Sequence, residues 1–137
     1  MPRVRRVLET AIYVDDLQRA QRFYELVLRL SVMSSGDRLV AMDAGEGTVL
    51  LLFRRGTTGD GASFPGGWIP PHQGSGSPHF ALAIDSEELA GWRDRLAEHG
   101  VGIESEVQWD LGGTSLYFRD PDGHSVELAT PGVWPIY

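Results

Sequence analysis

The sequence predicts an α+β fold in which two βαβββ modules in tandem form a curved mixed sheet with a cleft on its concave side. Two observations support this prediction. The chain contains an internal repeat, in which a strand, a helix and a closing group of strands each occur twice. The repeated strands also alternate bulky side chains with small or polar ones, as strands with one buried face do.

The first strand of each module emerges when residues 9–15 are aligned with residues 79–85, an offset of 70. Because successive side chains of a strand point to opposite faces, the bulky members are expected to pack on a helix and the others to face the cleft. The bulky face holds Thr10, Ile12, Val14, Phe80, Leu82 and Ile84, and the cleft face holds Glu9, Ala11, Tyr13, His79, Ala81 and Ala83.

A helix is predicted after the first strand of each module. Asp15 or Asp16 suits the N-cap of the first helix, and Asp85 or Ser86 suits that of the second. Gly100 is a suitable residue for ending the second helix. Apolar residues recur at helical spacing in both segments, at Leu17, Ala20, Phe23, Tyr24, Val27 and Leu28 in the first and at Leu89, Trp92 and Leu96 in the second.

The closing strands of the modules align with an offset of 76, which sets residues 40–52 over residues 116–128. In the second module, residues 120–123 read Asp-Pro-Asp-Gly, which reverses the chain into a hairpin. Glu127 alternates with apolar neighbours and therefore points into the cleft. Its counterpart in the first module is Leu51, so only one of the two modules places a carboxylate here.

These elements predict a single domain over residues 1–137. A segment between the modules carries seven of the seventeen glycines and three prolines, which predicts a linker without regular structure. The linker either arches over the cleft, with Trp68 and Ile69 as a lid, or is a mobile tether. The apolar C-terminal tail is expected to pack on the domain or on a partner subunit. The boundaries are about 5–55 for module 1, 56–77 for the linker, about 78–130 for module 2 and 131–137 for the tail.

Composition narrows the functional classes. A chain of 137 residues with 42% hydrophobic residues can bury one core. The formal net charge of −7 argues against nucleic acid as a partner. The longest apolar run, Val49 to Phe53, is too short to cross a membrane, and no apolar signal segment follows the arginine-rich start. We therefore expect a cytoplasmic protein. The absence of cysteine excludes disulfides and thiolate ligands.

Three side chains that can ligate a metal ion point into the predicted cleft. Glu9 and His79 occupy equivalent positions at the starts of the two repeated strands, and Glu127 lies on the cleft face of the last strand. A histidine with two carboxylates suits one divalent ion of Fe, Mn, Zn or Ni and leaves positions for water and substrate. A histidine in an apolar strand is more often structural, so the repeat is what favours ligation by His79.

The remaining cleft face is mostly apolar, which favours a small hydrophobic or aromatic ligand. We expect Tyr13, Leu51, Phe53, Trp68 and Tyr117 to bind the substrate. Tyr117 either donates a hydrogen bond or a proton during catalysis or is a structural phenol.

The other histidines fit less demanding roles. His99 is expected near a helix end, His124 in the hairpin turn and His72 as a spare ligand in the linker. The sequence contains no phosphate-binding glycine loop, HExxH or GxSxG motif.

The run YFRDPDGHSVEL at residues 117–128 resembles the closing strands of the vicinal oxygen chelate superfamily. That superfamily includes glyoxalase I, fosfomycin-resistance proteins, extradiol dioxygenases and bleomycin-binding proteins. IYVDDL at residues 12–17, Phe23-Tyr24 and HFAL at residues 79–82 extend the resemblance over almost the whole chain. It implies a glyoxalase/dioxygenase-like fold, a metal ligand at Glu127 and a substrate contact at Tyr117.

The sequence departs from this family at two positions. Leu51 stands where glyoxalase I-like members have a fourth ligand, so the resemblance supports a three-ligand site. Glu9 stands where dioxygenase-like and fosfomycin-like members usually have histidine. Two carboxylates neutralise a divalent ion, which should make its bound water a weaker acid than a site with two histidines would.

The resemblance implies a metal-dependent enzyme of the lyase, isomerase or ring-cleaving dioxygenase type. Its substrate would be a small molecule chelated through vicinal oxygens, and Tyr117 and Glu127 would be the catalytic residues. Two alternatives stay open: a non-catalytic drug- or metabolite-binding protein of the bleomycin-resistance type, and a small non-catalytic subunit. We expect the protein to form a homodimer.

Overall fold

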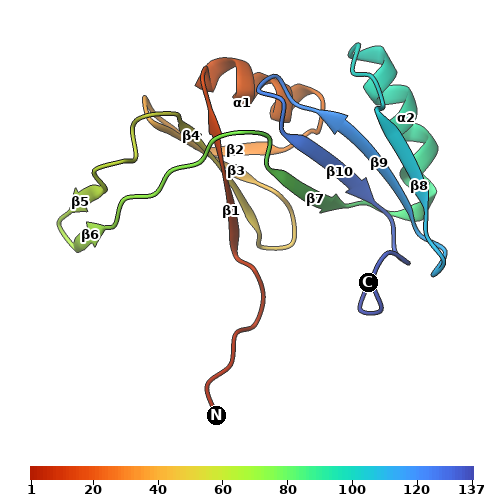
Figure 1. Ribbon diagram of the computed structural model, residues 1–137, viewed down its shortest axis with the longest axis horizontal. Helices are drawn as coiled ribbons and strands as arrows, with labels where there is room; N and C mark the ends of the chain where they lie inside the picture. Colours follow the sequence, from red (N-terminus) through yellow and green to blue (C-terminus); the bar gives the residue numbers. More distant parts are fainter. The chain divides into compact units, whose positions relative to one another are not determined.

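The computed structural model describes residues 1–137 as two compact units, unit 1 at residues 1–75 and unit 2 at residues 76–137. Each unit contains one βαβββ module, as the repeat predicts (Figure 1). Unit 1 consists of β1 (Glu9–Val14), α1 (Leu17–Leu26), β2 (Ser31–Ser35), β3 (Leu39–Asp43), β4 (Val49–Arg54), β5 (Ala62–Phe64) and β6 (Gly67–Ile69). Unit 2 consists of β7 (His79–Ala83), the 3₁₀ turn η1 (Ser86–Glu88), α2 (Leu89–Glu98), β8 (Ser105–Gln108), β9 (Thr114–Arg119) and β10 (Ser125–Ala129).

The module in each unit forms a four-stranded mixed sheet with the same connectivity. The strand orders are β1-β4-β3-β2 and β7-β10-β9-β8. In both sheets the first strand pairs in parallel with the last, whereas the other neighbours are antiparallel. Ala11 lies opposite Leu51, and Ala81 lies opposite Glu127. The paired residues of unit 2 are thus those of unit 1 shifted by 70 on the first strand and by 76 on the last, which are the two offsets of the sequence repeat.

One face of each sheet is buried, as the alternation predicts. In unit 1, α1 packs on β2, β3 and β4, and its buried residues include Ala20 and Tyr24. In unit 2, the buried residue of α2 is Leu96. The buried strand residues on this face are Ile12, Val14, Val40, Met42, Leu50 and Leu52 in unit 1 and Leu116, Phe118, Val126 and Leu128 in unit 2.

The helix ends agree with the predictions in part. Asp16 is the N-cap of α1, where its side chain accepts a hydrogen bond from the Arg19 amide at 3.0 Å. Asp85 makes no such bond and precedes η1, so α2 begins at Leu89, later than predicted, because a 3₁₀ turn takes up the intervening residues. Gly100 follows the end of α2 with a φ of 68°, which suits glycine.

The linker differs from the prediction because it contains regular structure. β5 and β6 pair as a short antiparallel hairpin, drawn apart from the four-stranded sheet of unit 1 in Figure 1. The segment after the hairpin is held by Arg55, whose guanidinium donates to the Gly74 carbonyl at 3.2 Å and to the Tyr13 carbonyl at 3.1 Å. The hairpin pairs its own backbone groups, and the arginine fastens the segment that follows to the end of β1. The expectation of a linker without regular structure is therefore wrong.

The C-terminal tail folds back on unit 2. The Tyr137 hydroxyl shares its proton between the carbonyls of Ile84 at 3.1 Å and Ala129 at 2.9 Å, close to the ends of β7 and β10. The Gly132 amide donates to the Tyr137 carbonyl at 2.8 Å, which closes the tail into a loop. The tail thus packs on its own unit, one of the two arrangements expected from its apolar composition.

Neither helix combines the length and the hydropathy that a membrane-crossing helix requires.

Candidate functional site

Two of the three predicted metal ligands lie together in unit 2. His79 begins β7, and Glu127 occupies the adjacent strand β10, two residues beyond the partner of His79. Nε2 of His79 lies 3.1 Å from Oε1 of Glu127. The parallel pairing of β7 with β10 positions both side chains on one face of the sheet, as the alternation predicts.

The tautomer of His79 follows from its other ring nitrogen. Nδ1 lies 2.9 Å from the carbonyl oxygen of Ser125, which can only accept, so Nδ1 carries the proton. In a neutral ring, Nε2 then presents a lone pair toward the Glu127 carboxylate. Two lone pairs at this distance repel unless the ring is protonated or a cation is shared between them. Two ligand atoms about 2.1 Å from one ion and at right angles stand about 3 Å apart, so the pair fits a divalent transition metal.

Glu127 is only 6% exposed, and its carboxylate is held by a chain of hydrogen bonds. The Ser115 hydroxyl donates to Oε2 of Glu127 at 2.5 Å. The Trp109 indole N–H donates in turn to the Ser115 oxygen at 2.9 Å. Since a buried carboxylate is costly without partners, these two side chains stabilise Glu127 in its buried position and orient it. Reasoning from the sequence missed both, because nothing in the strand pattern distinguishes Ser115 from a structural serine.

Tyr117 lies beside this pair, as expected. It is the antiparallel partner of Glu127, and its ring centroid lies 6.0 Å from that of His79. Burial raises the pKa of the Tyr117 phenol, and the negative charge of Glu127 raises it further. Tyr117 is therefore protonated at neutral pH and can donate a hydrogen bond.

A pocket of about 460 Å³ adjoins the pair in unit 2. His79, Tyr117 and Glu127 line it, together with the C-terminal tail, which contributes Trp134 and Tyr137. The tail thus forms part of the wall beside the candidate metal ligands, a role that its apolar composition does not reveal.

The third predicted ligand, Glu9, lies in unit 1. It begins β1, as His79 begins β7, and its cross-strand partner is Val49. Neither unit gathers three His, Asp or Glu side chains into a group that could hold a metal ion by itself. Ligation by Glu9 together with His79 and Glu127 therefore stays a prediction.

Glu9 lines a larger pocket of about 750 Å³ in unit 1. Tyr13, Leu51 and Phe53, three of the predicted substrate-binding residues, form part of its wall. Residues of the linker complete it, namely Thr58, Gly61, Ala62, Phe64, Ile69, Pro70 and His72.

Trp68 does not line this pocket and is 60% exposed. It lies between Gly67 and Ile69 in β6, and alternation along this short strand turns Ile69 toward the pocket instead. The structure therefore supports the linker as a wall of the pocket, with Ile69 rather than Trp68 as the lining residue.

His72 has a more specific position than its linker context suggests. Its Nδ1 lies 2.6 Å from the Tyr13 hydroxyl. Its ring meets that of Phe53 edge to face, with centroids 4.6 Å apart. No sequence signal could have found this contact, because it joins residues 59 positions apart through an irregular segment.

The two remaining histidines have structural roles. His124 is 1% exposed, and its Nδ1 lies 2.7 Å from the Asp120 carboxylate, which also accepts from the His124 amide. This pairing braces the turn between β9 and β10. His99 is the C-cap of α2, as its position next to Gly100 predicts.

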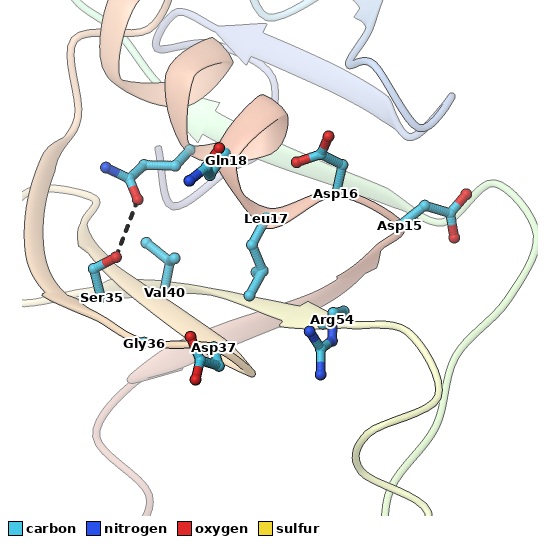
Figure 2. Close-up of a pocket in the computed structure, with 10 residues that line it drawn as sticks. Asp15, Asp16, Leu17, Gln18, Ser35, Gly36, Asp37, Val40 and Arg54 are labelled. Atoms are coloured by element: carbon cyan, nitrogen blue, oxygen red, sulfur yellow. Dashed lines mark hydrogen bonds between the residues drawn. The ribbon is translucent and has the colours of Figure 1, made fainter.

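A further pocket of about 540 Å³ lies at the start of α1 and the turn between β2 and β3 (Figure 2). Three carboxylates line it, those of Asp15, Asp16 and Asp37, and Figure 2 shows that they do not converge. Asp16 caps α1, and Asp15 forms an ion pair with Arg55 at 2.9 Å. Because two of the three carboxylates serve the fold, we assign no ligand to this pocket.

Comparison with known proteins identifies the family and agrees with the fold. The model of the Glyoxalase family, described as the Glyoxalase/Bleomycin resistance protein/Dioxygenase superfamily, matches residues 6–128. The chain belongs to this superfamily. Members of the glyoxalase/dioxygenase superfamily bind a divalent metal ion, and their fold is the one predicted from the sequence.

Individual members of the superfamily are similar over most of the chain. The metallothiol transferase FosB of Staphylococcus epidermidis (strain ATCC 12228 / FDA PCI 1200) is 30% identical over 119 residues, covering 85% of this chain and 75% of that protein. The glutathione transferase FosA of Serratia marcescens is 29% identical over 115 residues, covering 84% and 73%. The crystal structure of lactoylglutathione lyase from Agrobacterium tumefaciens superposes with a TM-score of 0.85 at 32% identity, covering 95% of this chain and 96% of that one.

Proposed function

We propose that this member of the superfamily is a divalent-metal-dependent enzyme acting on a small hydrophobic or aromatic molecule bound through vicinal oxygens. The proposed ligands are Glu9, His79 and Glu127, and the ion is Fe, Mn, Zn or Ni. One observation carries the proposal: the proton of His79 is committed to the Ser125 carbonyl, so its Nε2 lone pair faces the buried Glu127 carboxylate at 3.1 Å. This arrangement is suited to a shared cation.

The side chains around the ligands suggest a division of tasks. When bound, a divalent ion supplies Lewis acidity toward the oxygens of the substrate. Tyr117 is placed to donate a hydrogen bond to a substrate oxygen, and Glu127 to accept a substrate proton, which makes them the proposed catalytic residues. Tyr13, Leu51 and Phe53 offer an apolar and aromatic surface to the rest of the substrate.

Metal titration tests the proposal directly. Chelator-treated protein should bind about one ion of at least one of the four metals per chain in calorimetry. Glu127→Gln and His79→Gln should each weaken binding at least about a hundredfold, because loss of a ligand exceeds the effect of outer-shell changes. Glu9→Gln should weaken it similarly. His99→Gln is the matched control, since His99 only caps α2, and should bind as the wild type does.

Metal removal should also lower thermal stability. An ion at a hundredfold excess over its Kd stabilises the folded state by about 2.7 kcal/mol. For a domain of this size, a chelator should therefore lower the Tm by about 10 °C in calorimetry. A Tm that does not respond to the chelator or to any of the four ions would contradict a metal site.

A non-catalytic binding protein is the second candidate, because the pocket of unit 1 is largely apolar and already formed. Oxygen uptake and substrate loss, screened after anaerobic loading with Fe(II), separate the two functions. An enzyme consumes an oxygen-bearing aromatic or hydroxy-carbonyl compound, and a binding protein returns it unchanged.

We also propose that the protein forms a homodimer. Large apolar side chains are exposed in both units, including Val7 and Leu8 before β1 and Trp134 and Ile136 in the tail. Exposed apolar groups of this kind are typical of subunit contacts. Light scattering should give a mass of about twice 15.1 kDa. A mass equal to that of one chain at micromolar concentration would contradict the dimer.

A further inference from the structure

The pocket of unit 1 contains a hydrogen-bonded tyrosine–histidine pair that the proposed function does not use. The Tyr13 hydroxyl and Nδ1 of His72 lie 2.6 Å apart, and both residues line the pocket. Phe53 stacks on the Tyr13 ring at a centroid distance of 6.0 Å and meets the His72 ring at 4.6 Å. An aromatic ligand in this pocket would therefore lie against a surface that ends in a proton donor, the Tyr13 hydroxyl, and a proton acceptor, Nδ1 of His72.

The pair is fixed by the surrounding backbone. The His72 amide donates to the Thr58 carbonyl at 3.2 Å, and the hydroxyl of the buried Thr58 donates to the His72 carbonyl. On the other side, a Cβ at Gly74 would lie 2.4 Å from Cδ2 of Tyr13, so only glycine lets the chain pass this close to the ring. The linker is thereby held in the path that brings His72 to Tyr13.

The direction of the hydrogen bond follows from the chemistry of the two groups. Burial raises the pKa of the Tyr13 phenol, so Tyr13 is protonated at neutral pH and donates to Nδ1 of His72. A neutral His72 then carries its own proton on Nε2. The lone pairs of the Tyr13 oxygen that are not used in this bond can accept a hydrogen bond from a ligand.

We propose that Tyr13 and His72 form a proton relay that ionises a phenolic hydroxyl of a planar ligand in this pocket. The ligand O–H bond breaks, and its proton passes to the Tyr13 oxygen while the Tyr13 proton passes to Nδ1 of His72. The products are a ligand phenolate, an intact tyrosine and an imidazolium, so atoms and charge balance. The relay rests on the proposed function in one respect, since an ionised hydroxyl is what a vicinal-oxygen ligand needs to chelate a metal ion.

The charged surroundings of the pocket are compatible with this step. Apart from the pair itself, Glu9 and Arg38 are the ionisable side chains that line it. The positive charge of Arg38 favours a ligand anion.

The test uses 4-nitrocatechol, whose ionised form absorbs at longer wavelength than the neutral form. The full-length, chelator-treated protein is mixed with the probe at a pH where the free probe is mostly neutral. Binding to the wild type should increase the ionised fraction about tenfold, equivalent to one pKa unit. Tyr13→Phe and His72→Gln should remove this increase, and His72→Phe should do the same while keeping a ring against Phe53. His99→Gln should behave as the wild type.

Three results would overturn the relay: no binding of the probe, a bound probe no more ionised than the free one, or full ionisation by either His72 variant. A Tm close to that of the wild type shows that each variant is folded. Metal titration separates the relay from the proposed function. His72→Gln should bind metal normally, whereas Glu127→Gln should lose metal but still ionise the probe.

Discussion

The two modules bury the same sheet face under their helices but differ on the opposite face. Unit 1 presents apolar residues there, and unit 2 presents a hydrogen-bonded polar group. With the offset of 76, Leu39, Ala41, Leu51 and Phe53 of unit 1 correspond to Ser115, Tyr117, Glu127 and Ala129 of unit 2. In unit 1 these positions belong to the largely apolar pocket, and in unit 2 they surround the candidate pair of metal ligands.

The difference shows which positions of a repeated module can diverge. Residues under the helix are constrained by close packing, so Leu52 and Leu128 are the same amino acid and equally buried. Residues on the other face do not pack against a helix, and one backbone can therefore carry an apolar wall in one copy and a hydrogen-bonded polar group in the other.

The largest effect is expected where the modules agree. Leu52→Ala and Leu128→Ala each open a cavity under a helix and should lower the free energy of unfolding by about 2–5 kcal/mol. Urea denaturation measures both. If one variant cost less than about 1 kcal/mol, the two buried faces would not be equivalent.

A smaller effect is expected where the modules differ in polarity. Ser115→Ala removes the hydroxyl that donates to Glu127 at 2.5 Å, so the carboxylate loses a partner and its orientation. Metal affinity should fall by about 10–100-fold in calorimetric titration. Leu39→Ala, at the equivalent position of unit 1, is the control and should leave metal affinity unchanged. A reduced affinity in the control would show that the effect is not specific to the network around Glu127.

Leu51→Glu makes the first module resemble the second. It places a carboxylate at the position equivalent to Glu127, where glyoxalase I-like members have a fourth ligand. We expect metal binding to tighten about tenfold, or about 1.4 kcal/mol. Competition with a coloured chelator measures the change. An unaltered affinity, with unaltered absorption of the Co(II) form, would mean that residue 51 does not face the ion.

The smallest effect concerns the two tyrosines of the cleft faces. Burial raises the pKa of both Tyr13 and Tyr117, but only Tyr117 also has the charge of Glu127 beside it. Glu127→Gln should therefore lower the pKa of Tyr117 and leave that of Tyr13 unchanged, as measured by carbon NMR of labelled rings. Equal responses of the two rings would contradict a local effect.

The same phenols have a consequence for stability at high pH. Each is held protonated in the folded state above the ordinary tyrosine pKa of about 10, whereas the unfolded chain releases the proton there. Their contribution to the free energy of unfolding is complete below pH 10, and it is lost as the pH rises through the raised pKa of each phenol in the folded state. Urea denaturation at pH 9 and pH 11 measures this effect. The free energy of unfolding should fall less between the two pH values for Tyr13→Phe and Tyr117→Phe than for the wild type.

The sequence by itself determined the two modules, their strand registers and the face on which each strand residue lies. These features depend on the pleat of the backbone, which turns every second side chain to the same side wherever the strand is placed. The offsets of 70 and 76 therefore predicted that His79 and Glu127 would share a face, and that Leu51 would occupy in unit 1 the position of Glu127 in unit 2.

Only the tertiary structure decided what meets these faces. The β5–β6 hairpin, the bond from Tyr13 to His72 and the return of Tyr137 to Ile84 and Ala129 all join irregular segments to distant strands. Such contacts have no period in the sequence, because a loop follows whichever path satisfies its backbone groups and packs its side chains. For this reason most of the residues that wall the two pockets could not be predicted, and Ile69 was expected in only one of the two arrangements considered for the linker.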